Sequence, residues 1–312
     1  MGAGRFAPSP SGELHIGNLR TAILAWLFAR STGRRFLMRV EDLDRARAGA
    51  EAIQLRDLAA IGLDWDGPVE RQSERLDGLL SAVEDLRERG LLYECFCTRR
   101  DVVEAASAPH AAPGAYPGTC RDLGDAVRAE RRRSRPAALR LRSNVGEFTV
   151  TDALHGAHTG AVDDFVVVRN DGVPAYNLAV VVDDALQGID QVVRGDDLLS
   201  SSPRQAYLAS LLYGPEAIPE YAHVPLVLNS EGRRLAKRDG AVTLADLEKT
   251  GVSAFRTRSL LLRSLRLPED SLASALAAFD PARLPRDPWI HSPLTALDEG
   301  CDEASQTDRV QG

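Results

Sequence analysis

The apolar residues of the first 94 positions follow two different spacings, which predict alternating strands and helices. Residues 36–40 form a short apolar segment that is typical of a buried strand, whereas residues 51–61 and 76–89 carry apolar side chains at helical intervals. An earlier helix opens at His15 and is predicted to be amphipathic. Its apolar positions are Leu19, Ala22, Ile23, Trp26 and Leu27. Strands that alternate with helices indicate a parallel sheet with helices on its faces.

This pattern stops near residue 95 and resumes at residue 164. The intervening residues hold three of the four cysteines, a loop rich in Pro, Gly and Ala, an arginine-rich segment and short strand-like pieces such as 147–150. The α/β pattern then continues through apolar segments at 165–168, 178–182 and 191–194, a helix at 202–213 and an apolar strand at 224–228. The sequence therefore predicts one sheet that is split by an insertion.

Five segments are expected along the chain. Residues 1–94 and 164–242 are the two halves of an α/β domain, and residues 95–163 are the inserted subdomain. Residues 243–290 form a helical region, with helices to about residue 265 and again over 272–279. Residues 291–312 are polar and acidic without periodicity, which predicts a disordered tail.

Composition and charge narrow the class of protein. An apolar content of 44% and a charged content of 27% are ordinary for a soluble globular protein. No segment has the length of a membrane span or the pattern of a signal peptide, so we expect a cytoplasmic protein without a membrane partner. The net charge of −7 argues against a protein that coats nucleic acid nonspecifically, although a local basic face is compatible with it.

The densest basic run is Arg131-Arg132-Arg133-Ser134-Arg135, followed by Arg140 and Arg142. Two interpretations are open. The run is either a solvated, charged helix end or a surface that contacts RNA phosphates.

The segment from Arg5 to Asn18 has features of a phosphate site. A short apolar strand enters a Pro/Ser/Gly turn, and His15-Ile16-Gly17-Asn18 then opens the first helix. Gly12 and Gly17 permit a close approach of backbone to a ligand, and the N–H groups at a helix start attract anions. His15 is placed to add a further donor to the same anion.

A second group of residues has the chemistry to bind an amino acid. Arg5, Glu41 and Arg194 each lie at the end of a predicted strand, so they are expected to converge at one edge of the sheet. Glutamate offers an ammonium group and two carboxylates. Glu41 suits the ammonium, and the two arginines with Tyr176 suit the carboxylates. The alternative is that Glu41 only forms an ion pair with a nearby arginine.

Cys95, Cys97 and Cys120 are candidates for a metal site. A structural disulfide is not expected in a cytoplasmic protein, and Cys301 lies in the predicted tail. Structural zinc takes four ligands, so three thiolates leave one position open. His110 and Tyr116 are the nearby candidates, and general chemistry favours the histidine. Three unrelated buried thiols are the remaining alternative.

Residues 5–18 resemble the signature of class I aminoacyl-tRNA synthetases, in the variant of the glutamyl and glutaminyl enzymes. The resemblance implies a Rossmann-like α/β catalytic domain with an inserted zinc-containing subdomain and a short helical C-terminal region. It implies ATP with Mg²⁺ and L-glutamate as substrates. The glutamate-binding positions would be Arg5, Phe6, Ala7, Pro8, Ser9, Glu41, Tyr176 and Arg194.

Residues 233–241 resemble the second signature of this class, a lysine-containing loop that closes over ATP. Lys237 matches its second lysine, whereas Arg234 replaces the first lysine and Ala236 replaces a serine. The resemblance implies that His15 and Lys237 are catalytic, because they stabilise charge that develops on the phosphates. Together with Gly17 and Asn18 they would bind ATP.

The pattern Cys-x-Cys followed by Tyr-x-x-x-Cys resembles the zinc site of the glutamyl-Q tRNA(Asp) synthetase family, in which tyrosine is the fourth ligand. The resemblance implies one structural Zn²⁺ on Cys95, Cys97, Tyr116 and Cys120. Only about 70 residues follow the lysine loop, so the helical anticodon-binding region of a glutamyl-tRNA synthetase is expected to be absent.

Members of this family are usually monomers. They activate glutamate with ATP and transfer it to the queuosine base in the anticodon loop of tRNA(Asp). Two alternatives stay open. One is a shortened glutamyl-tRNA synthetase that charges the tRNA 3′ end, and the other is a non-catalytic paralogue that binds tRNA or ATP.

Overall fold

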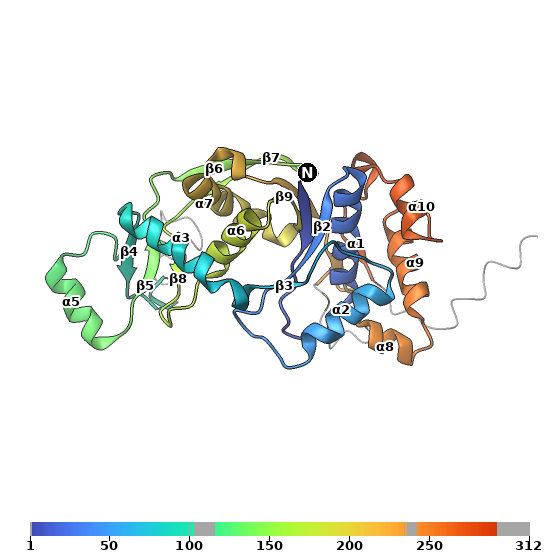
Figure 1. The fold of residues 1–312 in the computed structure, drawn as a ribbon, viewed down its shortest axis with the longest axis horizontal. Helices are drawn as coiled ribbons and strands as arrows, with labels where there is room; N and C mark the ends of the chain where they lie inside the picture. Colours follow the sequence, from blue (N-terminus) through green and yellow to red (C-terminus); the bar gives the residue numbers. More distant parts are fainter. Residues whose placement is uncertain (1, 99, 103–115, 234, 236–241, 292–312) are drawn as a thin grey trace, which may run out of the picture.

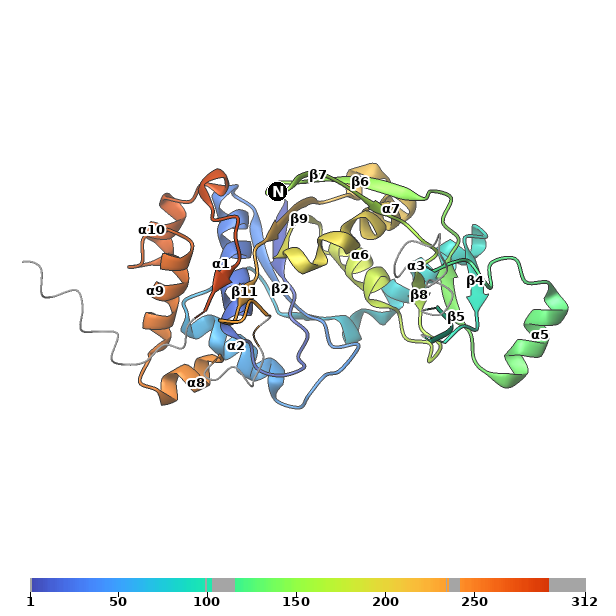
Figure 2. The same ribbon diagram turned by 180° about the vertical axis from the view of Figure 1, so that it is seen from behind.

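The fold is built on a seven-stranded sheet, seen from two opposite sides in Figures 1 and 2. In a computed structural model of the chain, the described residues are 2–98, 100–102, 116–233, 235 and 242–291. Six strands of the sheet are parallel and β7 is antiparallel to β6. Their order is β3 (Glu70–Arg71), β2 (Arg35–Val40), β1 (Ala3–Phe6), β9 (Ile189–Gly195), β10 (Glu220–Val224), β6 (Glu147–Asp152) and β7 (Gly156–Ala161).

The helices follow the alternation that the sequence predicts in the first part of the chain. Those of the α/β part are α1 (Ile16–Ser31), α2 (Ala50–Ala60), α3 (Leu76–Glu88), α6 (Tyr176–Leu186) and α7 (Ser202–Tyr213). The parallel sheet with helices, and hence the α/β fold class, is confirmed. The apolar segment 178–182 lies inside α6. Most of this helix is buried, so its apolar residues are consecutive and do not show the helical spacing of an amphipathic helix.

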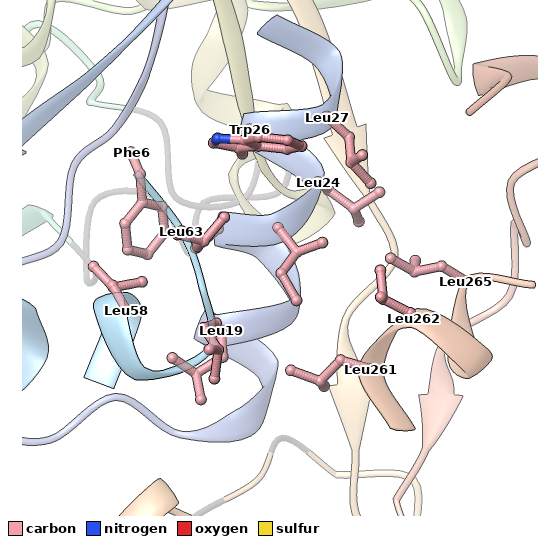
Figure 3. Packing of buried hydrophobic residues seen from close by; sticks show 14 of the residues in the cluster. Phe6, Leu19, Leu24, Trp26, Leu27, Leu58, Leu63, Leu261, Leu262 and Leu265 are labelled. Carbon is pink, nitrogen blue, oxygen red and sulfur yellow. The ribbon is translucent and has the colours of Figure 1, made fainter. Parts of the chain in front are cut away.

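Helix α1 is the centre of the largest core cluster. Figure 3 shows Phe6, Leu58 and Leu63 on one side of it, and Leu261, Leu262 and Leu265 on another. All five apolar positions predicted for this helix are buried. The prediction that the helix is amphipathic is wrong, because α9 and α10 cover the side that would otherwise face water, and even Arg20 is buried.

Arg20 is accommodated by two hydrogen bonds. Its Nη1 donates to the Pro225 carbonyl at 2.9 Å and its Nε to Ser264 Oγ at 3.0 Å. Pro225 also explains why the predicted strand 224–228 is two strands. β10 ends at Val224, and β11 (Val227–Leu228) begins after the proline, which has no N–H to donate.

A small antiparallel sheet lies toward one end of the molecule (Figure 1). It contains β4 (Leu92–Cys95), β5 (Ala138–Leu141) and β8 (Val166–Val168). Its outer strands lie at or beyond the limits expected for the insertion, 95–163, whereas β6 and β7 from inside that range extend the large sheet. Apolar alternation predicts a strand but not the sheet that it joins.

Helix α5 (Asp125–Ser134) stands beyond this small sheet, at the end of the molecule opposite to α9 and α10 (Figure 1). None of its residues is buried, and Arg131, Arg132 and Arg133 form its last turn. Arg132 and Arg133 are exposed and Arg131 is half-buried, so the run lies on a helix end at the surface, and contact with RNA phosphates stays a prediction.

The C-terminal part is helical, with α8 (Leu244–Lys249), α9 (Ala254–Ser264) and α10 (Leu272–Ala277). The chain then returns, and β12 (Trp289–Ile290) pairs in parallel with β11. Of the predicted tail, 291–312, only His291 is described, and its N–H donates to the Leu228 carbonyl at 2.8 Å. Within the described part of the chain, no helix combines the length and apolar character needed to cross a membrane.

Candidate active site and metal centre

Three of the predicted amino-acid-binding residues lie at the carboxyl ends of neighbouring strands. Arg5 is on β1, Glu41 directly follows β2, and Arg194 is near the end of β9. The strand order runs outward from β1 in both directions, to β2 on one side and to β9 on the other. The carboxyl edge at such a switch point is where open α/β sheets bind ligands.

Arg5 and Arg39 share one buried carboxylate. Arg5 Nε donates to Asp184 Oδ1 at 3.0 Å, and Arg39 Nη1 donates to the same oxygen at 2.7 Å. Arg39 also reaches Glu41 Oε1 at 3.4 Å and Gln187 Oε1 at 2.6 Å. Asp184 and Glu41 together offset the desolvation of Arg39, whose pKa is raised. Arg5 uses only its Nε in this network, and its two terminal nitrogens make no hydrogen bond to any described residue.

Arg194 is held from the other side of the site. Its Nε donates to His223 Nε2 at 3.0 Å and its Nη2 to Ser202 Oγ at 2.8 Å. Its Nη1 is buried and has no hydrogen-bond partner among the described residues. An unpaired buried donor on a cation costs free energy, so this nitrogen is suited to receive an anionic ligand.

Glu41 lies in the electrostatic field of Arg39 and Arg5, and Tyr176 lies in that of Arg194 and Arg5. Burial raises the pKa of the Glu41 carboxyl, and Arg39 and Arg5 oppose this shift. Tyr176 is 45% exposed, but desolvation of its hydroxyl raises its pKa, as does Glu41, while Arg194 and Arg5 act in the opposite direction. The structure thus brings Arg5, Glu41, Tyr176 and Arg194 into one cluster.

A cavity of about 670 Å³ opens beside this cluster. Its wall includes Ser9, Glu41 and Tyr176 on the side of the large sheet, and Cys95, Cys97, Thr98 and Arg135 on the side of the inserted subdomain. Arg5 and Arg194 are not part of this wall and are only 4% and 6% exposed. The cavity therefore joins the two regions that the sequence singles out.

The turn after β1 is held in place by hydrogen bonds to its backbone carbonyl groups. Gln54 Nε2 donates to the carbonyls of Ser9 and Gly12 at 3.0 and 2.6 Å, and the Glu41 N–H donates to the Pro8 carbonyl at 3.0 Å. The Phe6 side chain packs in the core (Figure 3), so only its backbone can face a ligand. Ala7 is half-buried and Ser9 is exposed.

His15 caps α1, and the cap uses much of the predicted phosphate site. Its Nδ1 accepts from the Asn18 N–H at 3.3 Å, and Asn18 Oδ1 accepts from the His15 N–H at 3.2 Å. In a neutral ring the proton therefore lies on Nε2. The Ile16 N–H donates to the Val242 carbonyl at 2.8 Å. Two of the first three N–H groups of the helix are thus used by protein atoms.

The two glycines of this segment serve different purposes. A Cβ at Gly17 would meet the His15 ring at 3.0 Å and Val227 at 3.3 Å, so the glycine makes room for protein side chains. A Cβ at Gly12 would meet nothing within 4 Å. Open space on the solvent side of the turn is compatible with close approach of a ligand at Gly12.

Lys237, Arg234 and Ala236 lie outside the described residues. Val242 and Thr243, which follow this segment in the sequence, lie close to the start of α1. Thr243 forms a β-bridge with His15, and the Val242 carbonyl accepts from Ile16. Val227 of β11 touches the position of Gly17. The role of Lys237 stays a prediction.

The metal-site residues converge in the inserted subdomain. Cys95, Cys97 and Cys120 have sulfur atoms within 4.8 Å of one another and could hold a metal ion. Cys97 Sγ lies 3.6 Å from Cys120 Sγ, and Tyr116 Oη lies 3.4 Å from Cys95 Sγ and 3.7 Å from Cys97 Sγ. His110 and Cys301 lie outside the described residues.

These spacings fit a tetrahedral zinc ion. Zn–S bonds of about 2.3 Å give S···S edges of about 3.8 Å, and a Zn–O bond of about 2.0 Å gives S···O edges of about 3.5 Å. The Tyr116 oxygen accepts from the Cys120 N–H at 2.8 Å, and the Arg140 guanidinium lies 3.5 Å from the centre of the tyrosine ring. Both contacts favour negative charge on the phenol oxygen, whereas burial raises its pKa.

Several residues that contribute to the site were not predicted from the sequence. Arg39, Asp184, Asp152 and His223 all contact predicted site residues or their partners. One signal was present for Asp184, because Asp183-Asp184 interrupts an apolar helix segment. Asp152 and His223 carried no local signal.

Comparison with known proteins identifies the family. The catalytic-domain model of the class I tRNA synthetases (E and Q) matches residues 3–272. A glutamyl-Q tRNA(Asp) synthetase of Nocardia farcinica is 67% identical over 290 residues, which are 93% of this chain and 93% of that protein. The chain belongs to the class I tRNA synthetases (E and Q), in the glutamyl-Q tRNA(Asp) synthetase family. A second relative of that name, from Cutibacterium acnes, is 56% identical over 86% of this chain and 77% of its own length.

The fold of this class I synthetase also matches a solved relative. A glutamate tRNA ligase from Elizabethkingia meningosepticum, solved in complex with its amino acid, superposes with a TM-score of 0.76 at 28% identity. The match covers 93% of this chain and 67% of that ligase. The expectation of a class I synthetase catalytic fold is therefore confirmed.

Proposed function

We propose that this synthetase activates L-glutamate with ATP and transfers it to queuosine in the anticodon loop of tRNA(Asp). The names of the relatives from Nocardia farcinica and Cutibacterium acnes support the reaction. The observation that carries the substrate is the cluster of two buried arginines with Glu41 and Tyr176. Arg194 Nη1 has no partner among the described residues, and Arg5 uses only its Nε. An amino acid with two carboxylates and one ammonium group is the complement of that arrangement.

Each residue has a role in the first step. Arg5 and Arg194 would hold the two carboxylates of glutamate, and Glu41 would hold its ammonium group. The ammonium would also stabilise the ionised form of Glu41, which burial disfavours. The α-carboxylate attacks the α-phosphorus of ATP, and glutamyl-adenylate and pyrophosphate form. Fixing the two reactants side by side provides much of the rate enhancement.

The nucleotide would lie at the start of α1. His15 Nε2–H, the Gly17 N–H and Lys237 are the donors proposed for its phosphates, and Asn18 fixes the His15 ring. ATP would bring Mg²⁺ on its phosphates. Positive charge at these positions stabilises the pyrophosphate as it leaves.

Zinc is proposed as a structural ion on Cys95, Cys97, Tyr116 and Cys120. Four protein ligands leave no open position, which is the arrangement of structural zinc. The ion would fix the small sheet and the wall of the cavity next to Arg135.

The acceptor nucleoside would enter through the same cavity. Its volume is about 670 Å³, and its wall includes Glu41 and Tyr176 of the glutamate cluster together with Arg135 and Arg169. A hydroxyl of queuosine attacks the adenylate carbonyl carbon, and AMP leaves. Helix α5 would contact the tRNA backbone, because its last turn carries two exposed arginines, Arg132 and Arg133. We expect a monomeric, cytoplasmic enzyme, with tRNA and ATP as its partners.

Transfer of labelled glutamate tests the proposal. The wild-type protein is incubated with ATP, labelled glutamate and one of three RNAs: tRNA(Asp) with queuosine, tRNA(Asp) without it, and tRNA(Glu). Label confined to the queuosine-containing tRNA is expected. Label on tRNA(Glu) would instead identify a shortened charging enzyme. Absence of glutamate-dependent ATP–pyrophosphate exchange would identify a non-catalytic paralogue.

A further inference from the structure

A continuous set of hydrogen bonds extends from Arg194 on β9 across β10 to β6, the strand next to the edge strand β7 of the large sheet. His223 on β10 is directly opposite Arg194 in the register of β9 and β10. His223 Nε2 accepts from Arg194 Nε at 3.0 Å, and His223 Nδ1 lies 2.6 Å from Asp152 Oδ2 on β6. Ser202, at the start of α7, accepts from Arg194 Nη2 at 2.8 Å.

All four side chains of this hydrogen-bond network are buried. His223 and Ser202 are completely buried, and Asp152 is 2% exposed. Asp152 is itself fixed, because its two oxygens accept from the N–H groups of His223, Leu154 and His155 at 2.9–3.0 Å. The network is therefore fixed at its outer end, and at its inner end Arg194 Nη1 is buried without a hydrogen-bond partner among the described residues.

The arrangement includes Ser202, His223 and Asp152 in hydrogen-bond contact, which invites comparison with a nucleophilic triad. Ser202 Oγ lies 3.0 Å from His223 Nε2. The Arg194 guanidinium donates to the same nitrogen, however, so the ring cannot accept a proton without placing two cations in contact. Ser202 is also inaccessible to any substrate. These facts exclude a nucleophilic role.

We propose that His223 and Asp152 are positioning residues that hold Arg194 in the orientation in which it binds a carboxylate of glutamate. The inference rests on the proposed function, since it assigns Arg194 to the substrate. Asp152 accepts the Nδ1 proton, which leaves Nε2 as an acceptor. Nε2 and Ser202 then fix two nitrogens of the guanidinium and direct the third, Nη1, toward the ligand.

The tautomer is the essential feature. The Asp152 oxygen next to Nδ1 selects the Nδ1–H form of the neutral ring, and only this form offers a lone pair to Arg194. Burial and the positive charge of Arg194 favour the neutral ring as well. The hairpin of β6 and β7, which comes from the middle of the chain, thereby contributes to substrate binding without contact with substrate.

Two amide substitutions at His223 separate its two bonds. His223→Asn keeps a donor near the Nδ1 position, toward Asp152, but removes the acceptor for Arg194. His223→Gln places a carbonyl oxygen near the Nε2 position and keeps that acceptor. We expect His223→Asn to raise KM for glutamate by about 10- to 100-fold in ATP–pyrophosphate exchange, because a hydrogen bond to a charged group is lost. His223→Gln should restore most of this loss, and KM for ATP should change little in either variant.

Asp152→Asn tests the tautomer. An amide N–H group facing Nδ1 favours the opposite tautomer, which turns a donor toward Arg194. The ¹⁵N spectrum of histidine-labelled protein should show an Nδ1–H ring for His223 in the wild type and lose it in this variant. His158→Asn, on the same hairpin, is the matched control and should leave the spectrum of His223 and KM for glutamate unchanged.

The results distinguish this proposal from the proposed function. If the wild-type protein exchanges pyrophosphate with glutamate and His223→Asn matches it in KM, the positioning role is wrong and the proposed function stands. Equal losses in His223→Asn and His223→Gln would also overturn it, because the acceptor would then not matter. An Nε2–H ring in the wild-type spectrum would contradict the proposal independently of activity. Failure of the wild type to exchange overturns the proposed function itself.

Discussion

The arginine cluster and the thiol cluster are built on opposite principles. Arg5, Arg39 and Arg194 are held by charged or polar protein groups of their own, Asp184, Glu41 and His223 among them, at 2.7–3.4 Å. The three cysteines and Tyr116 meet at 3.4–3.7 Å through weak sulfur contacts. The arginines of the first cluster are therefore held by protein groups even without a ligand, and the nitrogens left without a partner are the ones proposed to bind glutamate. In the second cluster, cations lie at the periphery: Arg131 Nη1 donates to Cys120 Sγ at 3.5 Å, and the Arg140 guanidinium lies 3.5 Å from the centre of the Tyr116 ring.

The difference follows from chemistry and burial. Buried cations need counter-charges, which the protein supplies from α6 and from the end of β2. Thiols can be buried in the neutral form. Burial raises the pKa of Cys97 to about 12, whereas at Cys95 hydrogen bonds from Tyr116 and Arg140 outweigh burial and lower the pKa of the thiol. The thiol cluster becomes charged when a metal ion displaces the protons. We therefore expect stability of the arginine cluster to be intrinsic and that of the thiol cluster to depend on metal.

The largest effect is expected from Arg39→Met. Arg39 is completely buried, and its removal leaves Arg5 as the one remaining cation that the described residues place at Asp184 and near Glu41. Loss of one partner of a buried ion pair costs about 3–5 kcal/mol of unfolding free energy. Urea unfolding measures this value. Arg133→Met, in which an exposed arginine of α5 is changed, is the control and should unfold like the wild type. Similar stability of both variants would mean that the cluster is not intrinsically stabilised.

Metal removal should affect the other half of the comparison. Cys97→Ser, or treatment of the wild type with a chelator, is expected to reduce bound zinc from about one ion per chain to about zero. Hydrogen exchange should then increase in residues 92–98 and 116–141 but not in α1. Unchanged zinc content in Cys97→Ser would contradict the proposed ligand set. Equal exchange changes in α1 would contradict the separation of the two clusters.

A smaller effect is expected from pH. His223 has a pKa below 6.5 because burial, Arg194 and His155 disfavour its charged form, and Asp152 opposes them. Tyr221 and Ser202 also face the ring. In the unfolded chain the His223 ring binds a proton near pH 6.5, whereas in the folded protein it stays neutral at that pH. Stability contributed by the neutral ring is thus present above pH 6.5 and lost below it, by up to about 1.4 kcal/mol per pH unit.

Comparison with His223→Gln isolates this contribution. The variant should lose less stability than the wild type between about pH 7.5 and about pH 5.5, because its amide does not titrate. Urea unfolding at several pH values measures both slopes. Parallel slopes would show that His223 does not titrate in this range, and the arginine cluster would then be less sensitive to protons than its geometry suggests.

The smallest effect concerns the surface beyond the thiol cluster. Arg133→Glu should weaken glutamate transfer to tRNA a few-fold, more at low salt than at high salt, because one phosphate contact is replaced by repulsion. ATP–pyrophosphate exchange should not change, since α5 lies at one end of the molecule, away from β2 and β9, whose carboxyl ends carry Glu41 and Arg194 (Figure 1). An equal loss in transfer and in pyrophosphate exchange would contradict this prediction, because it would mean that a change in α5 affects the arginine cluster. Arg87→Glu on α3 is the matched exposed control.

The sequence alone determined the features that depend on neighbours along the chain. The turn from Pro8 to Gly12, the helix cap at His15 and the helix at 202–213 follow from local spacing, and they lie where the spacing predicts them. The Cys95 and Cys97 pair is also local, because one intervening residue keeps both thiols on one segment. Arg5, Glu41 and Arg194 were predicted to meet because each ends a strand of a parallel sheet.

Only the tertiary structure decided which groups hold those residues in place. Arg5 and Asp184 are 179 positions apart, and Asp152 and His223 are 71 apart. The first contact depends on how α6 packs beside β1, and the second on the order of the strands, and apolar alternation encodes neither. The same holds for β6 and β7, which join the large sheet although they come from the inserted segment. A local pattern fixes the conformation of a segment, whereas the partner of a buried charge is fixed by how the segments pack.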